Sequence, residues 1–234
     1  MSVIRQNLQA VRQRITTAAD SAQRDVHAID LLAVSKTFGA DAVIAAAEAG
    51  QRAFGENYLQ EALDKIAAVR ATRPDLALEW HFIGPIQSNK TRPIAEHFDW
   101  VHSVDREKIA QRLSEQRPAH LPPLNVCLQV NISGEASKSG VLPADALAVA
   151  KAIAALPRLR LRGLMAIPEA EGDEAQQRAP FRQLHTLIDQ LCAAGLQLDT
   201  LSMGMSADMT AAIAEGATIV RIGSAIFGTR NYAK

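Results

Sequence analysis

Short runs of β-branched and aromatic residues alternate with longer amphipathic stretches along the chain. The first amphipathic stretch, residues 3–19, predicts a helix that precedes all of these runs. Eight runs then have the length and composition of strands. They cover residues 31–36, 52–57, 80–84, 100–105, 125–132, 162–168, 200–206 and 219–228. The stretches between them, such as DAVIAAAEAG and YLQEALDKIAAVRA, predict helices.

This regular alternation predicts a parallel sheet, because each parallel pair of strands needs a crossover that a helix supplies. Eight such units close into a barrel, and 234 residues agree with the roughly 250 typical of that architecture. An open doubly wound sheet is less favoured, since no GxGxxG motif follows the first strand. With no linker or repeat in view, we expect one α/β domain over residues 1–234, a (β/α)8 TIM barrel with an extra N-terminal helix.

Composition excludes several classes of function. The 25 basic and 25 acidic side chains balance, so neither nucleic acid nor an anionic membrane surface is an expected partner. Cys127 and Cys192 lack the spacing of a disulfide framework or of a zinc site. The N-terminus lacks a secretory signal, and no apolar run reaches the ~20 residues of a membrane span. We expect a soluble cytoplasmic protein without a bound metal.

Lys36 is the first candidate for chemistry, because barrels of this kind carry their active groups at the carboxyl ends of the strands. It follows the apolar run 31–34, so its stem is expected to start inside the barrel mouth. A partly desolvated lysine has a lowered pKa, and its neutral amine attacks a carbonyl to form a Schiff base. The alternative is a lysine that leans outward and pairs with Glu56. The spacing alone leaves both open.

The last two strand runs carry a pattern typical of phosphate sites. Ser206 can place its hydroxyl and the start of the following helix beside an anion, and Gly223 lets the backbone amides of residues 223 and 224 approach it closely. The loops after strands 7 and 8 are frequent phosphate sites in this architecture. The alternative makes Ser206 a helix N-cap and Gly223 a packing glycine.

Arg221 interrupts an apolar run, where a permanent cation needs a partner. Strand alternation places Arg221 and Gly223 on one face. If that face is the lumen, the guanidinium lies near a bound ligand. If it is not, an ion pair with Glu56 or Asp105 is the alternative.

Seven motifs occur in order over nearly the whole chain: LLAVSK, FGENY, WHFIGPIQSNK, VNISGEASKSG, GLMAIP, LSMGMSADM and VRIGSAIFGTR. Together they resemble the pyridoxal phosphate homeostasis protein family, which is similar to the barrel domain of alanine racemases. The resemblance implies pyridoxal 5′-phosphate as cofactor, held as a Schiff base on Lys36. It implies in addition phosphate binding by Ser206, Gly223 and Ser224, and Arg221 at the pyridine nitrogen.

The same resemblance implies ring contacts from Asn57 and Met165 and a role in cofactor storage, protection and delivery, with apo-forms of pyridoxal-phosphate enzymes as partners. A racemase needs a second acid/base group opposite the lysine, which in those enzymes is a tyrosine from a C-terminal domain. The sequence ends at Lys234, and neither Tyr58 nor Tyr232 follows from the barrel pattern as an opposed base. We therefore expect no catalytic residue and no robust turnover.

Two enzyme classes stay open as alternatives. One is a racemase-like enzyme that uses pyridoxal phosphate, and the other is a Schiff-base aldolase without it, which would need acidic groups and a second lysine around Lys36. His81 and His102 lack metal-ligand spacing and are expected to be structural, and Cys127 is expected to be a core thiol. Lys138 is on a loop near the mouth, where it is either solvated or able to hold a second phosphate or receive cofactor in transit.

Overall fold

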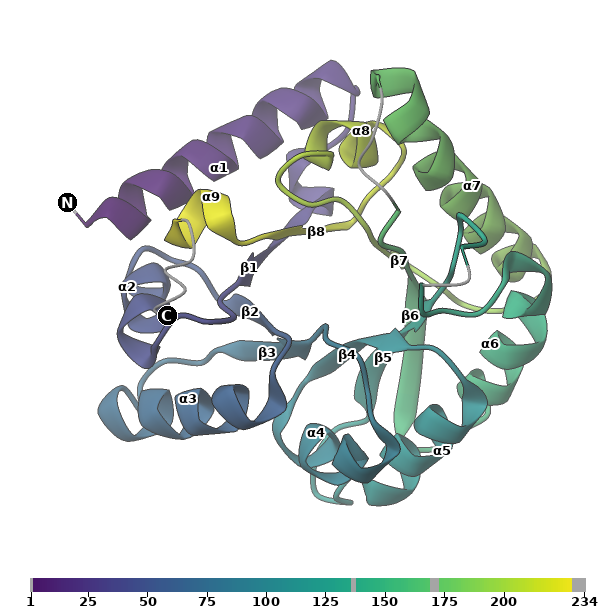
Figure 1. Cartoon of the computed structure of the whole chain (residues 1–234), viewed down its shortest axis with the longest axis horizontal. Helices are drawn as coiled ribbons and strands as arrows, with labels where there is room; N and C mark the ends of the chain where they lie inside the picture. The colour runs from purple at the N-terminus through teal and green to yellow at the C-terminus, as the bar shows by residue number, and fades with distance from the viewer. Residues whose placement is uncertain (1, 136–137, 169–172, 229–234) are drawn as a thin grey trace.

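Eight parallel strands close into a barrel in the computed structural model, which describes residues 2–135, 138–168 and 173–228. Strand order follows the chain, and β1 completes the ring by pairing with β8. The strands are β1 Asp30–Val34, β2 Ala53–Glu56, β3 Glu79–Phe82, β4 Trp100–Val104, β5 Leu124–Gln129, β6 Leu159–Met165, β7 Thr200–Ser202 and β8 Ile219–Ile222. Figure 1 looks into this ring. The predicted (β/α)8 barrel is confirmed.

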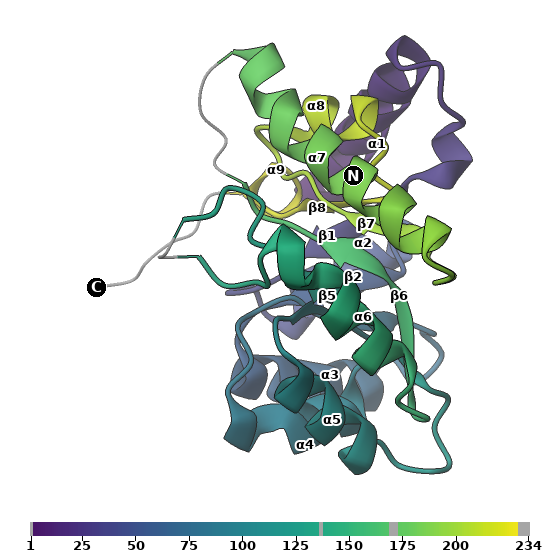
Figure 2. The same ribbon diagram turned by 90° about the vertical axis from the view of Figure 1, so that its right-hand side faces the viewer.

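The helices surround the barrel as an outer layer, which Figure 2 shows from the side. They are α1 Val3–Ser21, α2 Ala40–Glu48, α3 Leu59–Thr72, α4 Thr91–His97, α5 Glu107–Gln116, α6 Ala146–Ala154, α7 Glu174–Ala193, α8 Met209–Ala214 and α9 Ser224–Phe227. Short 3-10 turns cover Val26–Ala28, Ser88–Lys90 and Pro143–Asp145. None of the helices described here combines the length and the apolar character that crossing a bilayer requires.

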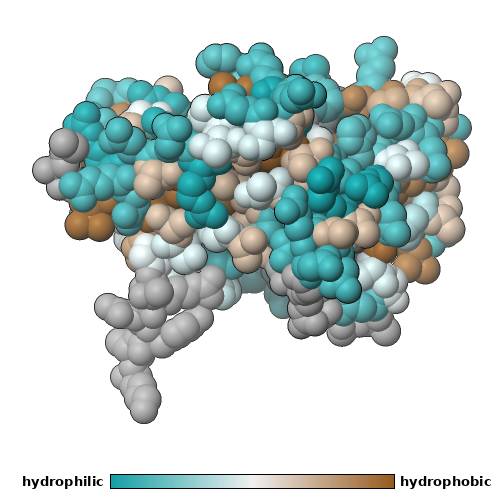
Figure 3. All heavy atoms as spheres, turned by 90° about the horizontal axis from the view of Figure 1, so that it is seen from above, coloured by the Kyte–Doolittle hydropathy of each residue, from teal (hydrophilic) through white to brown (hydrophobic). Residues whose placement is uncertain are grey.

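The additional N-terminal helix α1 forms because its sequence is capped and amphipathic. The Ser2 hydroxyl accepts the N–H of Arg5 at 3.3 Å, which satisfies one of the free donors of the first turn. The buried residues recur at helical spacing and include Leu8, Val11 and Ile15. They pack α1 against α2, α8 and α9. On the outer side of this layer, hydrophilic residues predominate and apolar ones are scattered between them (Figure 3).

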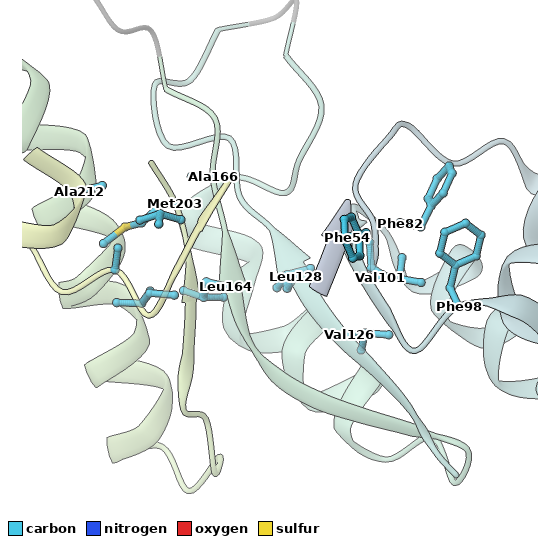
Figure 4. Packing of buried hydrophobic residues seen from close by; sticks show 14 of the residues in the cluster. Phe54, Phe82, Phe98, Val101, Val126, Leu128, Leu164, Ala166, Met203 and Ala212 are labelled. Carbon is cyan, nitrogen blue, oxygen red and sulfur yellow. The ribbon is translucent and has the colours of Figure 1, made fainter. Parts of the chain in front are cut away.

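The larger hydrophobic core lies between the strands and the helices (Figure 4). Phe82 of β3 meets Phe98 edge to face there, with ring centroids 5.3 Å apart. A second, smaller cluster fills the barrel interior and consists of Leu32, Trp100, Cys127, Met165 and Ile219. Strands buried on both faces carry nearly continuous apolar runs, which is why the eight strands could be recognised.

Cys127 is a core thiol, as predicted. It is fully buried in the interior cluster. Burial raises the pKa of its thiol to about 12, so the reactive thiolate is not populated near neutral pH.

Candidate functional site

A cavity of about 310 Å³ opens at the carboxyl ends of the strands. Its size lies within the roughly 300–1,000 Å³ typical of small-molecule sites. The ends of β1, β2, β7 and β8 supply six of the seven residues that the sequence suggested: Lys36, Asn57, Ser206, Arg221, Gly223 and Ser224. Apolar side chains that sequence analysis had not singled out, among them Phe38, Ile83 and Met205, complete the wall.

Lys36 lies in a tight turn just beyond β1. The N–H of Phe38 donates to the carbonyl of Ser35 at 3.1 Å and closes the turn. Thr37 has a φ of 70°, a left-handed conformation that a β-branched residue rarely adopts. Its N–H donates to Glu61 Oε1 at 2.6 Å, so α3 holds the turn in this conformation.

A buried ion cluster holds the other side of the same turn. Lys65 Nζ of α3 donates to the Ser35 carbonyl at 2.8 Å, to Glu56 Oε1 at 2.6 Å and to Glu61 Oε1 at 3.0 Å. Burial raises the pKa of the Glu56 carboxyl, although Lys65 opposes this shift. Glu56 therefore pairs with Lys65 rather than with Lys36. Sequence analysis missed Lys65, although its place beside Ile66 on the buried face of α3 was a usable signal.

Ser206, Gly223 and Ser224 form the side of the cavity next to α8 and α9. Asp208 is the N-cap of α8 and accepts the N–H of Met205 at 2.5 Å, so the alternative of Ser206 as N-cap is wrong. A Cβ at Gly223 would lie 3.1 Å from the Val34 carbonyl oxygen. This close approach to β1 brings the backbone of residues 223 and 224 to the cavity wall.

Arg221 lies in the barrel lumen, and its side chain contributes to the cavity. Nη1 donates to Ser202 Oγ at 2.9 Å, and Nη2 donates to the Ala166 carbonyl at 3.0 Å. These acceptors are neutral, so the ion pair with Glu56 or Asp105 that the sequence left open does not form within the described part of the chain. Burial lowers the pKa of Arg221 to about 10, which still leaves a cation at neutral pH.

Asn57 and Met165 differ in their relation to the cavity. Asn57 lines it, and its buried Oδ1 has no hydrogen-bond partner among the described residues. Buried polar atoms in folded proteins are nearly always paired, so this oxygen is an exception, and a contact between Asn57 and a ligand stays a prediction. Met165 is fully buried in the interior cluster and is not part of the wall, so its contact with a ligand stays a prediction.

Two further cavities have a different character. One of about 280 Å³ adjoins the first and includes Lys138, which pairs with Glu135 at 2.9 Å. A cavity of about 530 Å³ lies at the opposite end of the barrel beside Asp30 and Glu79, where barrels of this architecture do not carry their chemistry. Within the described ranges, no group of three or more His, Cys, Asp or Glu side chains could hold a metal ion.

Residues 6–231 match the family described as "Alanine racemase, N-terminal domain", and the chain belongs to this family. It is 65% identical over 232 residues to the pyridoxal phosphate homeostasis protein of Pseudomonas aeruginosa, covering 99% of this chain and 98% of that one. It is 55% identical over 234 residues to the protein of the same name from Escherichia coli K12, covering both chains fully. The chain is thus a member of the pyridoxal phosphate homeostasis protein family, as its motifs predicted.

Solved structures agree with this assignment. PipY from Synechococcus elongatus with PLP bound is 38% identical, with a TM-score of 0.82 over 96% of this chain and 100% of that one. Alanine racemase from Corynebacterium glutamicum is 19% identical, with a TM-score of 0.67 over 99% of this chain and 62% of that chain. The second likeness shows a shared fold.

Proposed function

We propose that this chain binds pyridoxal 5′-phosphate as a Schiff base on Lys36 and acts in homeostasis of that cofactor, through storage, protection and delivery. The observation that carries the proposal is the single cavity in which Lys36, Arg221 and the hydroxyls of Ser206 and Ser224 meet. The names of the relatives and the structure of PipY with PLP bound support the choice of ligand.

The residues around the cavity suit the groups of this ligand. The Lys36 amine would hold the aldehyde carbon of this ligand through a C=N bond, formed with loss of water. Ser206, Ser224 and the backbone N–H groups at residues 223 and 224 suit the phosphate. Arg221 suits the pyridine nitrogen as a donor, Asn57 lines the cavity where it can contact the ring, and Met165 is expected to support the ring from within the barrel.

The same lining supports binding without robust turnover. The described residues of the cavity wall include Lys36 but no His, Asp, Glu, Cys or Tyr that could act as a second acid/base group. The cofactor, when bound, supplies a ring that withdraws electrons from an attached amine. A guanidinium donor leaves the ring nitrogen unprotonated and weakens that withdrawal. A racemase-like enzyme is the second candidate, favoured by membership of the alanine racemase N-terminal domain family.

Location and recipients complete the proposal. We place the protein in the cytoplasm as a single domain, in accordance with its two separated cysteines and balanced charge. Apo-forms of enzymes that use pyridoxal phosphate are the proposed recipients, since a cavity whose described wall has no second acid/base group suits a carrier.

Borohydride trapping tests the ligand, the linkage and the site together. Protein saturated with pyridoxal 5′-phosphate is reduced, which converts the C=N bond into a stable amine, and the modified peptide is identified by mass. The label is expected on Lys36, and Lys36→Ala is expected to fold but to lose both the label and the visible absorbance. Lys108→Ala, on the exposed side of α5, is the matched control and is expected to keep both. Wild-type label found on another lysine contradicts the proposal.

A further inference from the structure

Five polar side chains form one line of hydrogen bonds through the barrel interior. Its steps are Arg221 Nη1 to Ser202 Oγ at 2.9 Å, Ser202 Oγ to His102 Nδ1 at 2.7 Å, His102 Nε2 to His81 Nδ1 at 2.8 Å, and His81 Nε2 to Glu79 Oε1 at 2.7 Å. The line starts at the cavity on β8, crosses to β7, β4 and β3, and ends at the opposite mouth of the barrel. Ser202 and His102 are fully buried, so they depend on these bonds.

The two ends of this line fix the direction of the hydrogen bonds. The Arg221 guanidinium has donors only, so Ser202 Oγ accepts from it. At the other end the hydrogen bond from His81 holds the pKa of the Glu79 carboxyl below its usual range, so Glu79 is an ionised acceptor. His81 Nε2 therefore carries a hydrogen.

The middle of the line follows from its ends. Burial above all, together with the nearby Arg221 cation, holds the pKa of His102 well below its usual range, so this imidazole is neutral. Because Ser202 Oγ already accepts from Arg221, its own hydrogen goes to His102 Nδ1, and the neutral His102 then carries its hydrogen on Nε2 and donates it to His81 Nδ1. A ring nitrogen that accepts has no hydrogen, so His81, with its hydrogen on Nε2, is neutral as well. Each donor then has one acceptor, and all the hydrogen bonds run from Arg221 to Glu79.

The opposite arrangement fails at Ser202. A hydrogen on His102 Nδ1 would make both His102 and Arg221 donors to Ser202 Oγ. The hydroxyl hydrogen would then have no acceptor among the described contacts of Ser202, which is fully buried. A buried hydroxyl without an acceptor is unfavourable.

We propose that Ser202 and His102 are positioning residues for Arg221. Through the line of hydrogen bonds directed toward Glu79, they hold its guanidinium as a donor aimed at the ring nitrogen of the bound ligand. The identity of that ligand rests on the proposed function, whereas the direction of the line does not.

Nitrogen-15 NMR of the ligand-free protein, labelled at histidine, tests the direction of the line. Both His81 and His102 are expected to be neutral rings that carry the hydrogen on Nε2. The chain has six histidines, so the signal that disappears in a His102→Gln variant identifies His102 in the spectrum. A hydrogen on Nδ1 of either ring overturns the proposal. Glu79→Gln replaces an acceptor by a group that also donates, so a second tautomer of His81 is expected. Glu107→Gln, at the exposed start of α5, is the control and is expected to leave the spectrum unchanged.

Ser202→Ala tests the positioning role. Loss of one hydrogen bond to Arg221 is expected to weaken pyridoxal 5′-phosphate binding about fivefold and to shift the visible absorbance of the bound ligand. Ser202→Thr, which keeps the hydroxyl, is expected to restore both, and Ser114→Ala, a buried serine of α5, is expected to change neither. Unchanged affinity and absorbance in Ser202→Ala overturn the positioning role. If the wild-type protein shows the expected tautomers but binds no pyridoxal phosphate, the proposed function fails while the direction of the line stands.

Discussion

Lys65 supports the turn around Lys36 through its bonds to the Ser35 carbonyl, Glu56 and Glu61. Lys65→Met keeps the apolar stem but leaves the Glu56 carboxylate buried without its cation, and removal of one partner of a buried pair typically costs about 3–5 kcal/mol. We expect a loss of that size in the free energy of unfolding, measured by urea denaturation near neutral pH. The deficit should shrink in acid, because a protonated Glu56 is less unfavourable to bury.

A second variant separates charge from packing at this site. In Lys65→Met with Glu56→Gln, no buried charge is left unpaired, so part of the lost stability should return. Lys108→Met removes an exposed lysine and should change stability by less than about 0.5 kcal/mol. Equal stability of Lys65→Met and wild type would show that the buried pair does not support this turn.

Individual residues could be predicted where their chemistry was unusual for their surroundings. Lys36 and Arg221 were found because a charged side chain within or after an apolar strand needs a reason. Met165 was expected at the cavity but lies within the barrel interior. Both faces of a parallel strand are apolar, so the sequence alone does not tell which face an apolar residue of β6 occupies.

Whole elements were predicted more securely than their ends. All eight strands formed where short apolar runs stood, but the runs that begin at Leu31 and Thr200 extend past the strands into loops. Those loop residues shape the cavity, and their conformation depends on contacts with other elements. Ser206 shows this, because Asp208 two residues later became the N-cap of α8.

The contact between the loops that follow β2 and β3 gives a prediction about packing of elements. Gly84 follows β3, and a Cβ there would lie 2.2 Å from the carbonyl oxygen of Asn57 and 2.8 Å from its Cα. Gly84→Ala must therefore displace the backbone that carries Asn57 at the cavity wall. We expect a destabilisation of about 1–3 kcal/mol in urea unfolding, as for overpacked sites, together with weaker binding of pyridoxal 5′-phosphate.

Gly39→Ala is the matched control for this change. A Cβ at Gly39, before α2, has no atom within 4 Å, and its backbone does not need glycine. Only a small loss of helix capping, on the order of 0.5 kcal/mol, is expected there. Equal effects of the two alanines would show that the contact between Gly84 and Asn57 is not what positions this wall.

At the scale of the molecule, barrel closure brings together groups that no local pattern connects. His102 and Ser202 are 100 positions apart in the chain, yet their side chains meet at 2.7 Å across the lumen. Each residue is unremarkable in its own strand, and only the closed ring makes them partners. The hydrogen-bond line therefore could not be predicted from the sequence, whereas the cavity residues at the strand ends could.

The balance between carrier and enzyme is also a property of the whole molecule. Saturated with pyridoxal 5′-phosphate in deuterated water, the wild-type protein should exchange the α-hydrogen of L-alanine no faster than free cofactor does. On the proposed function, Lys36 is the acid/base group among the described residues of the cavity wall, and an Arg221 donor at the ring nitrogen would leave that nitrogen unprotonated. Proton NMR measures the exchange, and chiral analysis of the alanine measures racemisation.

Arg221→Glu makes this last prediction sharper. A carboxylate at the ring nitrogen favours its protonated form, so the variant should exchange the α-hydrogen faster than wild type while racemisation stays low for want of an opposed acid. The variant lacks the bonds of Arg221 to Ser202 and Ala166. Borohydride trapping on Lys36 must therefore first show that it still binds the cofactor. Lys36→Ala, which lacks the amine for a Schiff base, gives the background rates of α-hydrogen exchange and racemisation. Fast racemisation by the wild-type protein that disappears in Lys36→Ala would favour a racemase-like enzyme over a carrier as the function of this protein.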